Sequence, residues 1–381
     1  MNILIIGNGF DLAHDLPTKY ENFLDFTNAY LRIPCFDSKY TASFNDYFKR
    51  IKQENPSVYE EIGSLIKDNV WLKHFNAVYE ERRKEGKIGW IDFESEISNA
   101  VQALDGAIST INEYLRKGKD QGRMEAYQFE SLKYLIGLET SRFSNAYFDM
   151  RPMSRYREQF LDDLNKLTRC LEIYLSDYIN NLPVSKRLPD ILGLKVDKVL
   201  SFNYTNTYER LYGKDNPDIK YDYIHGKADI SHDINSCNLV LGIDEYLPEK
   251  ERDENIEFIQ FKKFYQRIYK KTGCKYLDWI SKHLIQLHEM QESQKGSIIV
   301  AEALQVYIFG HSLDDTDKDI LKELIMTENT ITKIFHFNQD ALGKQIGNLV
   351  KVIGQKNLIS MVHGQFASII LQQQQLLIST E

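Results

Sequence analysis

The chain has 381 residues, enough for two to three domains of about 150 residues each. Hydrophobic residues make up 43% and charged residues 27%, with 23 Tyr and 20 Phe, which excludes an intrinsically disordered protein. The net charge of −8 argues against a protein whose main task is to coat nucleic acid or an anionic membrane.

The sequence predicts a cytoplasmic protein without a membrane anchor. No apolar run approaches the length of about 18 residues that a transmembrane helix needs, and the first residues lack the basic region of a signal peptide. The four cysteines, Cys35, Cys170, Cys237 and Cys274, form no CxxC pair. They therefore predict neither a disulfide framework nor a zinc ribbon, and no metal is expected.

The chain opens with the pattern of an α/β sheet. The apolar run 3–6 predicts a buried parallel strand that ends at Gly7. Apolar residues then recur at helical spacing from Phe10 to Leu24, and Pro17 predicts a kink or break. A strand, a glycine turn and a helix in succession are typical of α/β folds.

Residues 30–189 differ from this opening, because glycine is scarce and apolar residues recur at intervals of three and four. This periodicity predicts a helical insertion. The expected helices lie at 40–52, 57–85, 93–117, 123–140 and 154–181.

Strand-like runs return after this insertion and alternate with helical segments. Helices are expected within 249–296 and at 317–328, and strands at 196–202, 221–225, 239–243, 297–300, 306–309, 331–337 and 349–353. The predicted fold is α/β, a doubly wound and mainly parallel sheet with large α-helical insertions. Its expected parts are a discontinuous core (1–29, 190–247 and 297–365), two insertions (30–189 and 248–296) and a tail (366–381).

The turn after the first strand reads GNGFD over residues 7–11. A Gly-x-Gly turn between a strand and a helix directs backbone N–H groups toward a phosphate. The dinucleotide fingerprint needs a third glycine where this chain has Leu12, so an ordinary Rossmann dehydrogenase is disfavoured. The alternative is a tight turn in which Asp11 only caps the helix.

Polar residues also follow the next two core strands. The segment 201–206 reads SFNYTN, and its alternative interpretation is a loop in which Asn203 and Thr205 form local turns. His225 ends an apolar run and precedes Gly226. A lone histidine is more often structural, and no carboxylate and third ligand accompany it at a metal-binding spacing.

A fourth polar segment, 310–317, follows the expected strand 306–309. Its glycine permits close backbone approach, and Ser312 or Asp314 could hold a ribose or merely cap the next helix. The alternative for Asp315, Asp317 and Asp319 is that they are solvated surface residues without a role in binding. Four such strand ends in one sheet predict a nucleotide-binding cleft.

The same segments closely resemble the AbiH family of bacteriophage abortive-infection proteins. The resemblance spans the whole chain, is specific at the motifs and is loose in the helical insertions. The matching blocks are 3–20, 201–205 with Tyr208-Glu209, 224–226, 239–244 and 308–317.

These blocks are also similar to a divergent sirtuin-type, Rossmann-like NAD fold. Gly7 and Gly9 with Leu16-Pro17, the segment 202–205, and His225-Gly226 occupy the positions of sirtuin motifs. Residues 310–313 resemble the late ribose-contacting segment of bacterial sirtuin-like defence NADases. Thr205 stands where sirtuins carry Asp, Asp11 stands where they carry a small residue, and the paired cysteines of the zinc module are missing.

The resemblance implies an anti-phage defence protein that hydrolyses NAD at the nicotinamide–ribose bond, whose transition state is oxocarbenium-like. It implies that Asn203 orients water or the carboxamide, that His225 accepts a proton, and that Asp11 holds the carboxamide or stabilises the developing cation. The residues implied in binding NAD are Gly7, Asn8, Gly9, Phe10, Tyr204, Thr205, Gly310, His311, Ser312 and Asp314.

Other functions stay open at this point. The main alternative is a non-catalytic module that binds NAD or ADP-ribose, with the insertions sensing a phage component. A toxin nuclease is disfavoured by the negative net charge, and a protein deacetylase by the missing zinc module. The oligomeric state, homo-oligomer included, is left open.

Overall fold

The computed structural model describes the chain except for residues 87–90, 118–130, 137–152, 294–301, 366 and 376–381. The chain divides into two compact units. The first, here the α/β unit, comprises Met1–Thr18, Ile179–Lys227 and Lys271–Glu381, and the second, the helical unit, comprises Lys19–Tyr178 and Ala228–Lys270.

The α/β unit is built on a six-stranded sheet in which every pairing is parallel. The strand order β3-β2-β1-β4-β5-β6 is that of doubly wound dinucleotide-binding sheets, and it reverses between β1 and β4. The strands are β1 (Asn2–Ile6), β2 (Lys198–Ser201), β3 (Lys220–Tyr223), β4 (Leu304–Phe309), β5 (Thr330–His336) and β6 (Ile369–Gln373).

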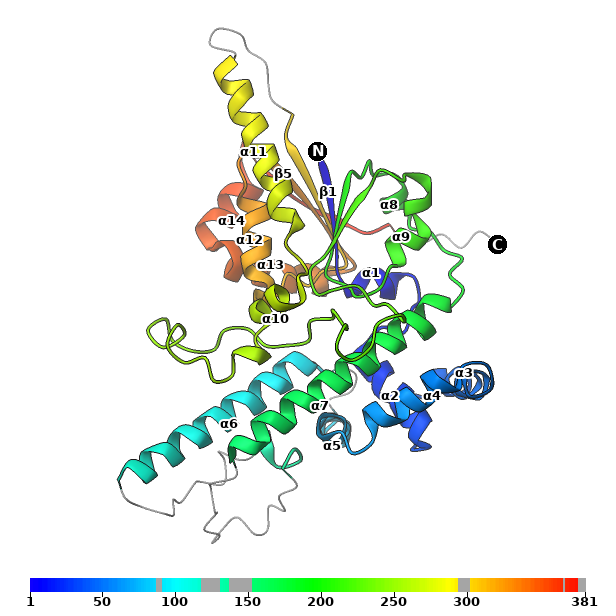
Figure 1. The fold of residues 1–381 in the computed structure, drawn as a ribbon. Helices are drawn as coiled ribbons and strands as arrows, with labels where there is room; N and C mark the ends of the chain where they lie inside the picture. Colours follow the sequence, from blue (N-terminus) through cyan, green and yellow to red (C-terminus); the bar gives the residue numbers. More distant parts are fainter. Residues whose placement is uncertain (87–90, 118–130, 137–152, 294–301, 366, 376–381) are drawn as a thin grey trace. The chain divides into compact units, whose positions relative to one another are not determined.

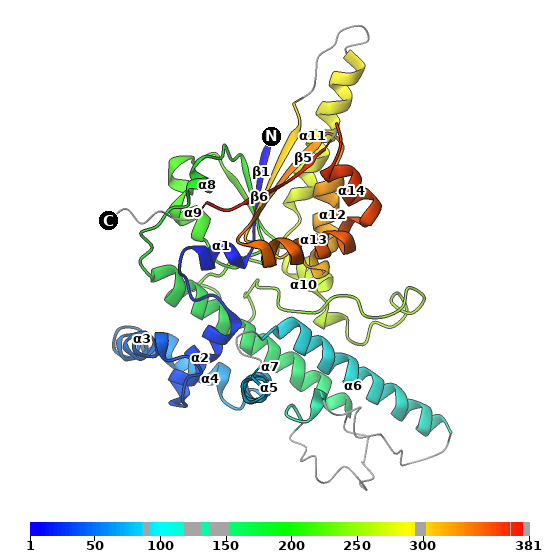
Figure 2. The same ribbon diagram turned by 180° about the vertical axis from the view of Figure 1, so that it is seen from behind.

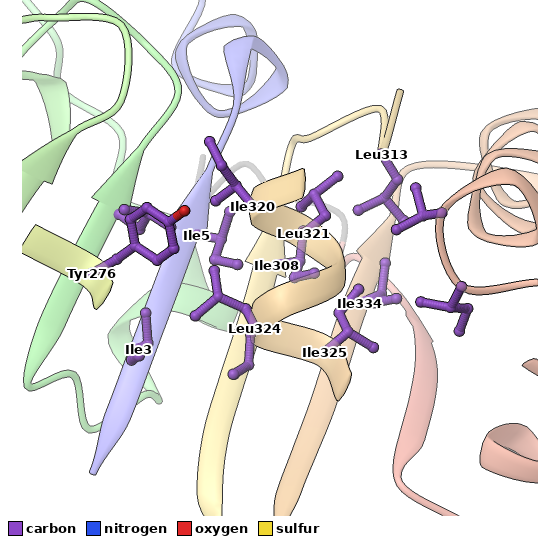
Figure 3. Close-up of a cluster of buried hydrophobic side chains, with 14 of the residues drawn as sticks. Ile3, Ile5, Tyr276, Ile308, Leu313, Ile320, Leu321, Leu324, Ile325 and Ile334 are labelled. Atoms are coloured by element: carbon purple, nitrogen blue, oxygen red, sulfur yellow. The ribbon is translucent and has the colours of Figure 1, made fainter. Parts of the chain in front are cut away.

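Helices cover both faces of this sheet (Figures 1 and 2). Leu4 and Ile6 of β1 point to one face and pack with residues of α1 (Asn8–Ala13), α8 (Pro189–Leu192) and α9 (Thr207–Leu211). Ile3 and Ile5 point to the other face, where Figure 3 shows Ile5 near Ile320 and Leu324. The helices on that face are α11 (Lys275–Ser293), α12 (Lys318–Met326), α13 (Gln339–Ile353) and α14 (Gln355–Val362).

None of the strands β1–β6 lies in the described residues of the helical unit. Its core is aromatic: Phe75 and Phe93 stack with ring centroids 3.9 Å apart, and Trp71 packs edge-on against Phe160. Helix α7 packs against α4, α5 and α6. The helices are α2 (Tyr20–Leu31), α3 (Thr41–Glu54), α4 (Pro56–Ile66), α5 (Val70–Lys84), α6 (Phe93–Arg116), α7 (Met153–Ile173) and α10 (Lys263–Lys270).

The structure confirms a doubly wound parallel α/β sheet and the strands expected near 3–6, 196–202, 221–225, 306–309 and 331–337. The helices expected at 40–52, 93–117 and 317–328 are also present, whereas 57–85 forms two helices separated at 67–69. The expected strand 297–300 and most of the expected helix 123–140 lie outside the described residues.

Two expected strands are wrong. Residues 349–353 end helix α13, because Leu349, Val352 and Ile353 are buried at helical spacing while Val350 is exposed. Residues 239–243 form a buried irregular segment with a single isolated bridge, Ile243 to Lys262. A short apolar run has the same pattern whether it is a buried strand or a buried loop.

The sequence predicts a tail at 366–381, and the described residues of this segment include β6, the edge strand beside β5. The two compact units also differ from the expected domain boundaries, since 19–29 and 228–247 belong to the helical unit and 271–293 to the α/β unit.

Candidate functional site

The carboxyl ends of β1 to β4 meet at one edge of the sheet. Ile6 pairs with Ser201 of β2 and Phe309 of β4, and Ser201 pairs in turn with Tyr223 of β3. The residues that follow these strands are therefore neighbours. Ligands of open α/β sheets bind at this edge, where the strand order reverses.

The glycines after β1 and β4 pack backbone against backbone. A Cβ on Gly9 would lie 2.8 Å from the Cα of Gly310, and one on Gly7 would lie 2.7 Å from the Cα of His311. The N–H of Gly9 donates to the Gly310 carbonyl at 2.8 Å, and that of Gly7 donates to Phe309 at 3.2 Å. Two backbone donors that the sequence assigned to a phosphate thus already have protein acceptors.

Asp11 lies buried beneath this edge, with 1% of its surface exposed. Its Oδ2 accepts the hydroxyl of Thr205 at 2.6 Å, and the Thr207 hydroxyl donates to Thr205 Oγ1 at 3.2 Å. Among the described residues, Oδ1 of Asp11 has no hydrogen-bond partner. Burial raises the pKa of Asp11 to about 6, against the lowering effects of the two threonine hydroxyls and of the Arg210 charge.

Asn203 ties the ends of β1 and β2 together. Its side-chain amide donates to the carbonyl of Gly7 at 3.0 Å. The hydroxyl of Ser201 donates to the Asn203 carbonyl at 2.9 Å and accepts the Asn203 N–H at 3.1 Å. Asn203 is 6% exposed, so it holds this turn in place as well as lying at the site.

His225, after β3, and His311, after β4, share one carboxylate. Asp317 Oδ1 lies 3.3 Å from His225 Nε2, and Asp317 Oδ2 lies 3.5 Å from His311 Nε2. The ring of Phe202 packs edge-on against both, with its centroid 5.7 Å from that of His225 and 4.3 Å from that of His311. Nδ1 of His225 is buried without a partner among the described residues.

Asp317 is a site residue that the sequence does not readily reveal, because its local pattern is that of a solvated surface acid. The structure shows it 9% exposed, immediately before α12. A signal was present in the sequence: Asp317 precedes the buried Ile320 and Leu321 by three and four residues, and such spacing places side chains on one face of a helix.

The remaining predicted binding residues differ in their accessibility. Tyr204 is half-buried, with its ring 6.3 Å from that of His225, and Ser312 is exposed. Asn8 is exposed and accepts the hydroxyl of Thr18 at 2.6 Å. Asp314 caps the short turn before α12 by accepting the N–H of Thr316 at 3.2 Å.

Phe10 is a core residue in this structure. Its side chain is fully buried, and its ring packs with those of Tyr208, Tyr212 and Phe309 at centroid distances of 6.0 Å. A direct contact between Phe10 and a ligand would require this packing to open.

Within the residues that the structure describes, no group of three His, Cys, Asp or Glu side chains is arranged to hold a metal ion. The helices described here also include none whose length and apolar character would allow it to span a membrane.

Comparison with known proteins gives the family of this chain. No curated protein matches its sequence. The sequence profile of the family described as Bacteriophage abortive infection AbiH matches residues 3–338, which include all four strand ends of the site. The chain therefore belongs to the AbiH family of bacteriophage abortive infection proteins.

Proposed function

We propose that this protein hydrolyses NAD at the nicotinamide–ribose bond as its part in abortive infection. One observation carries the proposal: a histidine nitrogen, His225 Nδ1, and a carboxylate oxygen, Asp11 Oδ1, lie buried and unpartnered by the described residues at the ligand-binding edge of the sheet. Buried polar atoms are normally satisfied, so such atoms at a sheet's ligand edge support a bound polar substrate.

The reaction needs a positioned water and a proton acceptor. The water oxygen bonds to C1′ of the ribose while the C1′–N bond breaks, and the bonding electron pair neutralises the pyridinium nitrogen of the departing nicotinamide. The water proton passes to His225. The products are nicotinamide, ADP-ribose and a proton, which is later released from the histidine. Because the leaving group is already cationic, the site must orient water and stabilise an oxocarbenium-like transition state more than it must activate a strong nucleophile.

Asn203 and Asp11 are assigned to orientation and charge. The amide nitrogen of Asn203 is engaged with Gly7, which leaves its Oδ1 as the atom to accept a carboxamide N–H or a water. Oδ1 of Asp11 is a second acceptor, and its negative charge when ionised would stabilise the ribosyl cation.

The two departures from the sirtuin pattern lie in contact with each other. Thr205 replaces an acidic residue and Asp11 replaces a small one, and the structure joins their side chains by a 2.6 Å hydrogen bond. The carboxylate missing at one position is thus supplied from the neighbouring strand end. Because the carboxylate is retained at the site, this exchange supports a catalytic site over one that has lost activity.

The pyrophosphate is assigned to different groups than the sequence indicated, since the Gly7 and Gly9 amides are already engaged. We assign it to the exposed side chains of Asn8, which lies between Gly7 and Gly9, and of Ser312, which follows the turn at Gly310. The glycines contribute by letting the two turns approach closely.

Nicotinamide release tests this function. Purified protein is incubated with NAD, with and without lysate of phage-infected cells, and nicotinamide and ADP-ribose are measured over time; the His225→Ala variant is the matched control. Stoichiometric release that requires His225 supports hydrolysis. Calorimetric binding of NAD or ADP-ribose without turnover in either condition would overturn it in favour of a non-catalytic sensor.

A further inference from the structure

A single carboxylate organises two histidines at the candidate site. Asp317 faces His225 with one oxygen and His311 with the other, at 3.3 Å and 3.5 Å from their Nε2 atoms. All three side chains are largely buried, between 4% and 12% exposed. A carboxylate can only accept hydrogen bonds when ionised, so each facing Nε2 must carry a hydrogen for these contacts to be favourable.

The second nitrogen of each ring distinguishes the two histidines. Nδ1 of His311 accepts the backbone N–H of Leu313 at 2.9 Å, so both of its nitrogens are engaged. Nδ1 of His225 has no partner among the described residues. In the neutral tautomer with hydrogen on Nε2, Nδ1 of His225 is a buried lone pair available to a substrate proton, whereas Nδ1 of His311 is not.

The position of Asp317 in the chain makes this arrangement specific. Asp317 precedes the first residue of α12, where an aspartate commonly accepts a backbone N–H of the first turn. Its side chain makes no capping hydrogen bond here, and the carboxylate faces the two rings instead. The carboxylate of Asp317 therefore serves as a shared acceptor for the two histidines instead of capping α12.

We propose that Asp317 is a positioning residue that fixes the Nε2–H tautomer of His225 and thereby makes Nδ1 of His225 the atom that takes the proton from the attacking water. The assignment rests on the proposed hydrolysis of NAD, but the tautomer is a property of the free protein. An Asp that holds a histidine base in the correct tautomer is an established catalytic arrangement, in which Asp→Asn costs about 10,000-fold in kcat.

The test compares Asp317→Asn with Asp319→Asn, the same substitution at an exposed position in the first turn of the same helix. Imidazole nitrogens are observed in ¹⁵N-histidine-labelled full-length protein, with His225 assigned from the His225→Ala spectrum. Wild type and Asp319→Asn are expected to show Nε2 of His225 protonated and Nδ1 without a hydrogen. Asp317→Asn is expected to show a mixture of the two tautomers.

The same variants are compared in the NAD assay. Asp317→Asn is expected to lose at least 100-fold in kcat, with KM within a fewfold of wild type, and Asp317→Glu is expected to recover part of the loss.

The experiment tests the proposed hydrolysis of NAD and the positioning role of Asp317 independently. If wild type releases no nicotinamide, the proposed function is wrong, and the nitrogen spectra alone then decide the positioning role. If Asp317→Asn keeps the wild-type tautomer, or keeps wild-type kcat while His225→Ala is inactive, the positioning role is overturned. Where Asp317→Asn does not fold, the wild-type tautomer still decides, because hydrogen on Nδ1 of His225 contradicts the proposal.

Discussion

The two units each bury a polar cluster, and the clusters are satisfied to different degrees. In the helical unit, Arg169 is 1% exposed and donates to Glu61 at 2.8 Å, to Glu172 at 2.7 Å and to the carbonyls of Asp229 and Ile230. The other oxygen of Glu172 accepts from His232 at 2.6 Å. None of the polar atoms of Arg169 or Glu172 is unpartnered.

The cluster at the sheet edge of the α/β unit is satisfied only in part. Asp11 and His225 each keep one buried polar atom without a partner among the described residues. An unsatisfied buried polar group costs about 1–3 kcal/mol. The cluster around Arg169 is therefore fully hydrogen-bonded, whereas the sheet-edge cluster keeps free acceptor atoms, as the proposed function requires.

The largest effect is expected at His225. His225→Ala should lower the rate of NAD cleavage per folded molecule by about 100- to 10,000-fold, since a positioned acid–base group contributes that much. His232→Ala makes the same change in the helical cluster and should leave the rate per folded molecule unchanged while lowering stability. Nicotinamide release and urea unfolding of both variants measure the contrast, and equal activities of the two would contradict it.

Asn203→Ala should also abolish NAD cleavage and phage protection, but its interpretation is less direct. The variant removes the hydrogen bond to the Gly7 carbonyl along with the orienting amide. Its unfolding free energy must therefore be measured beside its activity, and a loss of activity is meaningful only where the variant remains folded.

The next largest effect is expected in the helical cluster. Arg169→Ala leaves the buried Glu172 without its cationic partner, and breaking a buried ion pair costs about 3–5 kcal/mol. Arg50→Ala is the control, because Arg50 and Glu54 form an exposed pair whose loss costs about 0.5 kcal/mol. Urea unfolding followed by circular dichroism measures both. Equal stability of the two variants would remove the distinction drawn between the clusters.

A smaller effect of opposite sign is expected at Asp11. Its pKa of about 6 exceeds the ordinary value of 3.8, so the folded state binds this proton more tightly than the unfolded chain. The contribution of Asp11 to stability is therefore lost as pH rises from about 4 to about 6, and Asp11→Asn should be more stable than wild type by about 2–3 kcal/mol at pH 7 but not below pH 4.

Unfolding measured across this pH range checks the prediction, with the exposed Asp15→Asn as control. The Asp11→Asn variant should at the same time cleave NAD more slowly. Destabilisation at pH 7 would mean that the Asp11 carboxylate is needed by the fold and not by a ligand.

The sequence indicated this edge of the sheet but not the bonding within it. Apolar runs followed directly by a glycine, Gly7 or Gly310, predicted β1 and β4, because buried parallel strands are continuous runs of apolar residues. The edge strand β6 escaped prediction, since only Ile369 of its residues is buried and the rest lack alternation.

Side-chain partners depend on contacts between residues far apart in sequence, which no local pattern contains. Asp317 looked like one of several surface acids, and only the fold brings it to His225 and His311. The glycine turn shows the same limit. Its local pattern suggests a phosphate-binding turn, whereas in the structure its backbone packs against the turn after β4.

The smallest effect tests that reinterpretation of the turn. Gly9→Ala would place a Cβ 2.8 Å from the Cα of Gly310, so we expect a loss of about 1–3 kcal/mol from overpacking. Gly347→Ala lies in the exposed interior of α13 with no atom within 4 Å of its Cβ, and it should gain about 0.5–1 kcal/mol from the lower conformational entropy of the unfolded chain. Thermal unfolding with and without saturating NAD separates packing from binding. If Gly9→Ala is as stable as wild type but is no longer stabilised by NAD, the turn contacts the ligand directly and the phosphate cradle first indicated by the sequence is restored.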